Sequence, residues 1–410
     1  MARRRSGSSP AKPRRRQHHS AAATPSPQRQ TAPATARTAG DAKAAEAVEP
    51  EALVVTYWFD SGSDGEPYDA TVRLSGRRVG IRGVPRAGDS FSRDEKIEGV
   101  VPGTGPVSIT AWVYGLQQGE WEVDARLIPT SRGARSAGSR PGSLAAIQPA
   151  TWSWRRWALS TAPASPVKTR WALLAPLARQ PAVIPGIYTA LAIVGFVAAL
   201  ALQAALLGGR GTSIDQPLVA SVLALIAGLI GAKVWYKVLH PVDPWLKSGG
   251  WAVDGFLVVA PLVGAVTLFA WDVPIGVALD ATAPGIFFAV ALGRIGCFLT
   301  GCCAGRCSDS RWAIWSSDRR VGARRIPTQL LESAAGLALG LGSLLVLVNG
   351  GLPIDGAVFV AAFVIYAVIR QGLLRVRAER RKEYRTLPLT AAAAGVVAAV
   401  VATLSLVQGT

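Results

Sequence analysis

Cysteine is scarce in this chain of 410 residues, and its distribution bears on metal and disulfide chemistry. The four cysteines all fall within the eleven residues 297–307, with the spacing C-x4-C-C-x3-C. This spacing is not typical of a zinc or iron–sulfur site. We therefore expect no metal and no cofactor, and small residues packing at a helix end explain the cluster most simply. A local disulfide, if the loop faces an oxidising compartment, and a metal site are the alternatives.

The chain also lacks the apolar segment that a secretory signal peptide would place after its basic start, M-A-R-R-R-S-G-S-S-P. We expect insertion into a membrane to depend on the first long apolar stretch, near residue 183.

Apolar residues make up 50% of the chain, yet its net charge is +18. This combination indicates a membrane protein with basic tails or loops rather than one soluble core. A membrane-spanning helix needs about 20 apolar residues. We predict seven such helices in an all-α polytopic domain over 181–410. They cover 183–207, 218–239, 253–271, 275–299, 328–349, 354–374 and 386–407.

Residues 1–50 are rich in Ala, Pro, Arg and Ser, with ten Lys or Arg against three acidic residues. Such a segment cannot bury enough apolar surface to fold, so we predict a disordered basic arm. Anionic lipid headgroups would attract it. We expect no nucleic-acid partner.

Residues 51–130 have a different pattern, in which β-branched and aromatic runs alternate with polar positions between glycine-rich turns. They predict a small antiparallel β-sandwich-like domain, with an accessory or docking role. Trp112 and Trp121 suit its core better than a ligand platform. Residues 131–180 are predicted as a linker whose T-W-S-W-R-R-W cluster, at 151–157, suits a membrane interface.

The most informative motif is G-R-I-G-C-F-L-T-G-C-C-A-G-R at 293–306, which ends an apolar helix. Glycines allow close approach to the backbone, and an arginine at the membrane boundary is costly unless an anion pairs with it. A lipid phosphate would provide that anion.

This motif resembles the signature of the prolipoprotein diacylglyceryl transferase family, and five further segments resemble the family in the same order. They are I-Y-T-A-L-A-I-V-G-F at 187–196, G-L-I-G-A-K-V-W-Y at 228–236, L-D-A-T-A-P-G at 279–285, R-R-I-P-T-Q-L-L-E-S at 324–333 and Y-A-V-I-R at 366–370. The loop S-G-G-W-A-V-D-G-F at 248–256 occupies the position of the family's glycine–histidine–glycine loop.

The resemblance implies transfer of a diacylglyceryl group from phosphatidylglycerol to the lipobox cysteine of a preprolipoprotein. The products would be a thioether and glycerol phosphate. Arg294 and Arg370 match the family's functional arginines, and guanidinium groups can hold phosphate with paired hydrogen bonds. The alternative for both is a helix-end anchor that reaches the headgroups.

The acceptor thiol must become a thiolate, because the thiol itself is a poor nucleophile. Asp254 stands where the family has its histidine, and we expect it either to act as the base or to order the loop. The remaining substrate-binding candidates follow from the resemblance. They are Tyr188, Lys233, Gly301, Gly305, Arg306, Gln329, Glu332 and Tyr366.

The signature also departs from the family pattern, since Cys297, Thr300 and Cys302 replace residues that are commonly Asn, Asn and Glu. Cysteine is a weak hydrogen-bond partner, so headgroup recognition is expected to differ. The alternative function is a catalytically silent family member that binds lipid or lipoprotein as a membrane scaffold. A channel or transporter is disfavoured because no inverted repeat relates the two halves.

The resemblance implies a multi-pass protein of the bacterial inner or plasma membrane, surrounded by membrane lipids, with its signature loop on the outer face. Basic residues before the first helix, at 306–325 and after the sixth helix instead indicate that this face is cytoplasmic. We favour the family orientation and leave the side of the β-domain open.

Overall fold

The computed structural model describes residues 51–378, apart from 85, 129–145, 163–165 and 242–250 and the side chains of 253 and 254. All of these residues belong to one compact unit, Val48–Thr410. The predicted basic arm and the predicted seventh helix, 386–407, lie outside the described residues.

The N-terminal part of the described chain is rich in β-strands, as the alternating pattern predicted. Its strands are β1 (Glu51–Asp60), β2 (Tyr68–Arg78), β3 (Ser90–Val100), β4 (Pro106–Leu116), β5 (Glu120–Ile128), β6 (Gln148–Ser153), β7 (Ala158–Thr161), β8 (Val167–Lys168) and β9 (Arg170–Trp171). Two antiparallel sheets result. One has the order β10-β11-β4-β1-β6-β7, with β9 also paired to β1, and it includes β10 (Ile314–Ser317) and β11 (Val321–Arg325) from later in the chain. The other has the order β3-β2-β5-β8.

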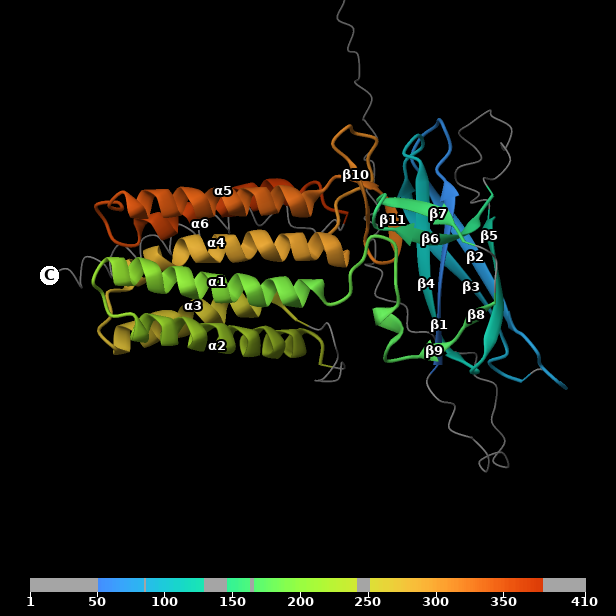
Figure 1. Ribbon diagram of the computed structural model, residues 1–410, viewed down its shortest axis with the longest axis horizontal. Helices are drawn as coiled ribbons and strands as arrows, with labels where there is room; N and C mark the ends of the chain where they lie inside the picture. The colour runs from blue at the N-terminus through green and yellow to red at the C-terminus, as the bar shows by residue number, and fades with distance from the viewer. Residues whose placement is uncertain (1–50, 85, 129–145, 163–165, 242–250, 379–410) are drawn as a thin grey trace, which may run out of the picture. The chain divides into compact units, whose positions relative to one another are not determined.

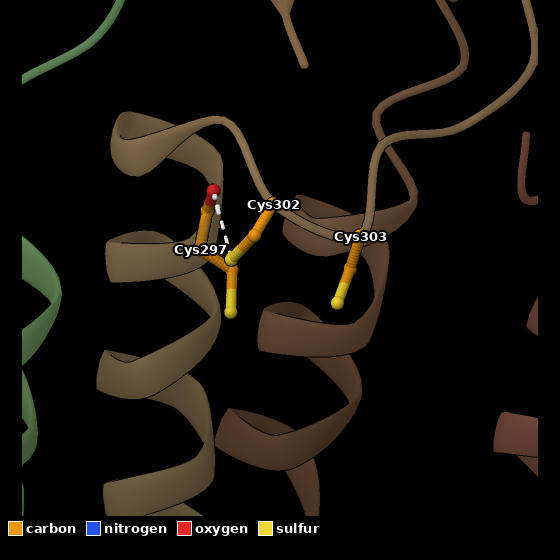
Figure 2. A group of neighbouring side chains, drawn as sticks. All are labelled: Cys297, Cys302 and Cys303. Atoms are coloured by element: carbon orange, nitrogen blue, oxygen red, sulfur yellow. Dashed lines mark hydrogen bonds between the residues drawn. The ribbon is translucent and has the colours of Figure 1, made fainter. Parts of the chain in front are cut away.

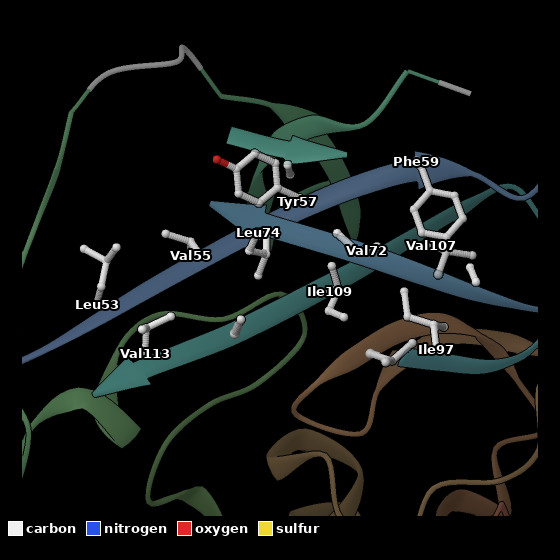
Figure 3. Packing of buried hydrophobic residues seen from close by; sticks show 14 of the residues in the cluster. Leu53, Val55, Tyr57, Phe59, Val72, Leu74, Ile97, Val107, Ile109 and Val113 are labelled. Carbon is white, nitrogen blue, oxygen red and sulfur yellow. The ribbon is translucent and has the colours of Figure 1, made fainter. Parts of the chain in front are cut away.

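One hydrophobic core lies between strands of both sheets (Figure 3). Ala70, Val72 and Leu74 share one face of β2 and are all buried, which agrees with the alternating pattern of the sequence. Trp121 is completely buried in this core. Trp112, also predicted as core, is only half-buried, and its indole Nε1 donates to the Ala175 carbonyl oxygen at 3.3 Å.

Residues 131–180, which we predicted as a linker, contain four of these strands and the short 3-10 helix Ala175–Leu177. Strands β6 and β9 pair with β1, and β8 pairs with β5, so this segment extends both sheets. Two of its predicted interface tryptophans, Trp152 and Trp157, contact each other edge to face.

Six helices follow in the described part of the chain, and they lie side by side in Figure 1. They are α1 (Ile187–Gly209), α2 (Asp215–Leu239), α3 (Val253–Ala270), α4 (Ile275–Thr300), α5 (Thr328–Val348) and α6 (Ala357–Leu374). Five of them, all except α3, are long and apolar enough to span a membrane. The described structure therefore supports a membrane protein without confirming the predicted count of seven spans.

Small residues allow the helices to pack closely. A Cβ atom at Gly285 of α4 would lie 2.8 Å from the Cα of Ala199 on α1, and one at Gly336 of α5 would lie 3.0 Å from the Phe287 carbonyl oxygen. These contacts fix α4 between α1 and α5.

A hairpin between α4 and α5 joins the helices to the β-domain. Its strands are β10 (Ile314–Ser317) and β11 (Val321–Arg325), and β11 pairs with β4 through Val321 opposite Ile109. The Trp315 indole also donates to the Pro106 carbonyl oxygen at 2.8 Å. One of the two sheets of the β-domain therefore also contains the hairpin that follows the signature motif.

Tyr57 ties the two sheets of the β-domain together, because its hydroxyl on β1 donates to the Val123 carbonyl oxygen on β5 at 2.7 Å. Burial, reinforced by the negative charge of Asp124, raises the pKa of Tyr57 from 10.0 to about 12. The neutral phenol is the form that the folded state favours. The stabilisation that results from the raised pKa of Tyr57 is therefore complete below pH 10 and is lost as the pH rises towards 12.

We predict that Tyr57→Phe lowers the free energy of unfolding by about 1 kcal/mol at neutral pH, because a buried hydrogen bond is lost. The difference from the wild type should shrink as the pH approaches the raised pKa. Thermal unfolding of the detergent-solubilised protein across this pH range measures both effects. Tyr114→Phe, at a half-exposed position on β4, is the matched control. Equal responses of the two variants would contradict the assignment.

Candidate functional site

The buried carboxylate of Glu332, on α5, is the centre of the candidate site. Three guanidinium groups pair with it: Arg294 Nη2 at 3.0 Å, Arg370 Nη1 at 2.6 Å and Arg377 Nη2 at 2.8 Å. The Tyr366 hydroxyl donates to the same carboxylate at 2.8 Å. The Glu332 side chain is 0% exposed, so these partners replace water around its charge.

Three helices and one loop supply this group of residues. Arg294 lies six residues before the end of α4, and Tyr366 and Arg370 are four residues apart on one face of α6. Arg377 follows the end of α6 and pairs as an isolated β-bridge with Gly305 of the signature loop. The group therefore depends on the contact between that loop and the chain after α6.

The charges of this group do not cancel, because three arginines face one glutamate. The Arg377 Nε is also buried without a hydrogen-bond partner among the described residues. Side-chain exposures of 16% for Arg294 and 32% for Arg370 leave part of each guanidinium accessible. Excess positive charge and an unused donor suit an anion with several oxygen atoms, such as a phosphate.

The loop after α4 is held by close backbone contacts. Gly301 adopts a left-handed conformation, with φ 73°, at the end of α4. A Cβ atom at Gly305 would lie 2.1 Å from the Ile326 carbonyl oxygen, so this position accepts only glycine without a shift of the backbone. Gln329 Nε2 donates to the Cys302 carbonyl oxygen at 2.9 Å, and Thr328 Oγ1 donates to that of Cys303 at 3.2 Å.

The loop also gathers three free cysteines (Figure 2). The Sγ atoms of Cys297, Cys302 and Cys303 all lie within 4.8 Å of one another. Arg294 Nη1 lies 4.0 Å from Cys297 Sγ, which places the thiols next to the arginine group. Cys307 is half-buried against the core of the β-domain instead.

The structure brings together four of the residues that the sequence singled out, Arg294, Arg370, Glu332 and Tyr366. Gln329 binds the adjoining loop. Tyr188 of α1 packs against the end of α4, where a Cβ atom at Gly296 would lie 3.0 Å from its Cα.

The other predicted residues lie elsewhere or are not described. Among the described residues, neither Lys233 nor Arg306 pairs with Glu332. Lys233 is on α2, with its Nζ 5.2 Å from the centre of the Trp251 ring, and the Arg306 side chain is exposed. The Asp254 side chain lies outside the described residues, so its predicted role stays a prediction.

Arg377 is the member of the group that the sequence did not single out. It falls in the basic run after the sixth predicted helix, and that run reads as a set of headgroup anchors. Arg377 lies seven residues after Arg370, but the two residues do not share a helix face, because α6 ends at Leu374. Only the pairing of this segment with the signature loop brings Arg377 to Glu332.

We predict that Glu332→Gln destabilises the protein by about 3–5 kcal/mol, because three partly buried guanidinium groups lose their counter-charge. A lower midpoint of thermal unfolding in detergent is the expected result. Glu122→Gln is the matched control, since Glu122 forms an exposed pair with Arg77 and such pairs contribute about 0–1 kcal/mol. Equal stability of the two variants would show that the Glu332 group is not a structural centre.

Comparison with known proteins agrees with the resemblance seen in the sequence. The profile of the prolipoprotein diacylglyceryl transferase family matches residues 183–408. Three bacterial relatives named as phosphatidylglycerol–prolipoprotein diacylglyceryl transferases are similar to this chain.

The relative from Dehalococcoides mccartyi (strain ATCC BAA-2266 / KCTC 15142 / 195) is 30% identical over 184 residues, which cover 41% of this chain and 68% of the relative. Phosphatidylglycerol–prolipoprotein diacylglyceryl transferase 2 of Clostridium perfringens (strain 13 / Type A) is 32% identical over 146 residues, which cover 32% of this chain and 56% of the relative. That of Clostridium tetani (strain Massachusetts / E88) is 27% identical over 198 residues, which cover 45% and 77%. The chain thus belongs to the prolipoprotein diacylglyceryl transferase family.

Proposed function

We propose that this protein transfers a diacylglyceryl group from phosphatidylglycerol to the lipobox cysteine thiol of preprolipoproteins. The single observation that carries this proposal is the group of three arginines around buried Glu332, which carries excess positive charge and includes Arg294 of the signature motif. Membership of the family supplies the identity of the two substrates.

The reaction breaks the bond between the glyceryl carbon and a phosphate oxygen, and it forms a carbon–sulfur bond to the acceptor. Negative charge grows on the leaving glycerol phosphate as the bond breaks. Fixed cations stabilise that charge, and such electrostatic stabilisation is usually the largest contribution to catalysis. We assign Arg294 and Arg370 to the phosphate, because both are partly exposed and can form paired hydrogen bonds with it.

Glu332 is a positioning residue in this proposal. It binds all three arginines through two oxygen atoms, so their guanidinium groups are oriented before the lipid arrives. Tyr366 fixes the carboxylate in turn, through its own hydrogen bond. Arg377, whose buried Nε has no hydrogen-bond partner within the described part of the chain, is the third candidate for contact with the headgroup.

The membrane setting follows from the apolar helices and from the family. We propose a multi-pass protein of the bacterial plasma membrane in which 386–407 forms a seventh span. Pairing of β11 with β4 supports placing the β-domain on the same side of the membrane as the arginine group. An accessory role in docking the preprolipoprotein, with its lipobox peptide, fits this position.

We predict that Arg294→Ala and Arg370→Ala each reduce lipidation by about a hundredfold or more, the usual effect of removing a donor that stabilises developing charge. Complementation of a bacterium depleted of its own transferase, read by the mass shift of a lipoprotein, measures the effect. Lysine at either position should restore only part of the activity, since it cannot form paired hydrogen bonds.

Arg77→Ala is the control, because Arg77 forms an exposed ion pair in the β-domain. Membrane insertion of each variant is checked by its yield in the membrane fraction. Normal lipidation by both variants at Arg294 and Arg370 would refute the assignment of these residues to the phosphate.

For Asp254 we propose the role of base towards the acceptor thiol. Asp254→Asn is then expected to lower the transfer rate while phosphatidylglycerol still binds, because only proton transfer is affected. A transfer assay and a lipid-binding assay on the same purified variant separate the two. An unchanged rate would assign activation of the thiol to another group.

A further inference from the structure

The three-cysteine cluster is the group of reactive side chains that the proposed function leaves unused. Cys297 lies in the last turn of α4, while Cys302 and Cys303 lie in the loop that follows. The spacing argued against a metal site, because the paired motifs of zinc proteins are absent. The fold removes that argument by placing all three Sγ atoms within 4.8 Å of one another.

We propose that Cys297, Cys302 and Cys303 bind one zinc ion through three thiolates and leave its fourth position open. Zinc–sulfur bonds of about 2.3 Å in a tetrahedral site place sulfur atoms about 3.8 Å apart. The observed sulfur atoms, all within 4.8 Å of one another, are separated by at most about 1 Å more than that spacing. Figure 2 shows the three sulfur atoms on the same side of the loop.

The backbone around the cluster combines an uncommon conformation with side-chain hydrogen bonds that hold it in place. Cys303 has φ 56°, a left-handed conformation that is uncommon for a residue with a side chain. The carbonyl oxygens of Cys302 and Cys303 accept hydrogen bonds from Gln329 and Thr328. These contacts hold the two neighbouring thiols towards Cys297, as the residues around a metal site orient its ligands.

The charges near the cluster favour deprotonated sulfur. Three thiolates and Zn²⁺ together carry one negative charge, and the Arg294 guanidinium lies 4.0 Å from Cys297 Sγ. A cation at this distance stabilises thiolates and the metal complex that they form. The thiol proton that Cys302 now donates to the Cys297 carbonyl oxygen, over 3.7 Å, would leave on binding.

The open position suits the thiol of an incoming cysteine. When that thiol binds, its proton would pass to Asp254, the base in the proposed function, a zinc–sulfur bond would replace a zinc–water bond, and no electron would be transferred. The resulting thiolate lies beside the arginines assigned to the donor phosphate. This assignment of the fourth ligand rests on the proposed function, whereas binding of the metal does not.

The test is the zinc content of the purified full-length protein in detergent, measured by inductively coupled plasma mass spectrometry after incubation with zinc and dialysis. We expect about one zinc per chain. Cys302→Ser and Cys303→Ser should weaken binding roughly a hundredfold or more, since even residues outside the ligand set contribute about 10–100-fold. Cys307→Ser, which removes the cysteine outside the cluster, should bind zinc like the wild type.

A second measurement does not depend on the folding of variants. Cobalt added to the wild-type protein should give the intense near-ultraviolet sulfur-to-metal charge-transfer band of a thiolate site. Protein that binds neither metal would overturn the proposal, as would a disulfide between two of the three cysteines in protein isolated without reductant. Zinc bound without any transfer activity would leave the metal site standing and overturn the proposed function.

Discussion

A single buried carboxylate is the constraint on which the functional half of this protein depends. Glu332 has no exposed surface, and its charge cannot be buried unless the guanidinium groups around it are closely matched to it in geometry. To meet that requirement, α4, α5, α6 and the segment after α6 must converge at one point. The same convergence leaves excess positive charge next to the signature loop, which is what recognition of a phosphate needs.

The β-domain is part of this arrangement rather than an independent appendage. Strand β11 links it to the segment between α4 and α5, and the Trp157 indole donates to the Trp315 carbonyl oxygen at 2.9 Å. Trp157 also stacks on Phe298 of α4, with ring centres 6.0 Å apart. The β-rich region therefore contacts both the hairpin between α4 and α5 and the end of α4.

The conflict over membrane orientation has a physical explanation in the same region. The basic residues at 306–325 indicate a cytoplasmic face by the positive-inside rule, but several of them form bonds within the protein. Arg325 pairs with Asp318 at 2.8 Å, Arg319 Nε donates to the Thr300 carbonyl oxygen, and Arg320 pairs with Glu95 at 3.5 Å. Charges fixed in this way say little about which face is cytoplasmic.

Much of this architecture could be predicted from the sequence, because it depends on local patterns. Long apolar stretches predicted the five described helices that are long and apolar enough to span a membrane. The alternation of apolar and polar residues indicated the buried face of β2. The family motifs pointed to Arg294, Arg370, Glu332 and Tyr366. Arg377 and the pairing of Val321 with Ile109 were not predicted, since both depend on contacts between distant segments that carry no local signal.

The cysteine cluster shows the same limit of sequence patterns. Sequence spacing identifies metal ligands that come from one hairpin or turn. Here the left-handed backbone of Cys303 and the hydrogen bond from Thr328, at the start of α5, bring the thiols close together. From the positions of the four cysteines in the sequence, packing, a disulfide and a metal site were all possible explanations.

The central claim is that guanidinium groups at this site stabilise the donor phosphate while the acceptor sulfur takes the glyceryl group. The most direct measurement uses purified protein in liposomes that contain phosphatidylglycerol labelled in its acyl chains, together with a lipobox peptide. The account predicts that the label moves to the peptide cysteine and that glycerol phosphate is released in equal amount. A protein that is inserted and folded but never moves the label would contradict it.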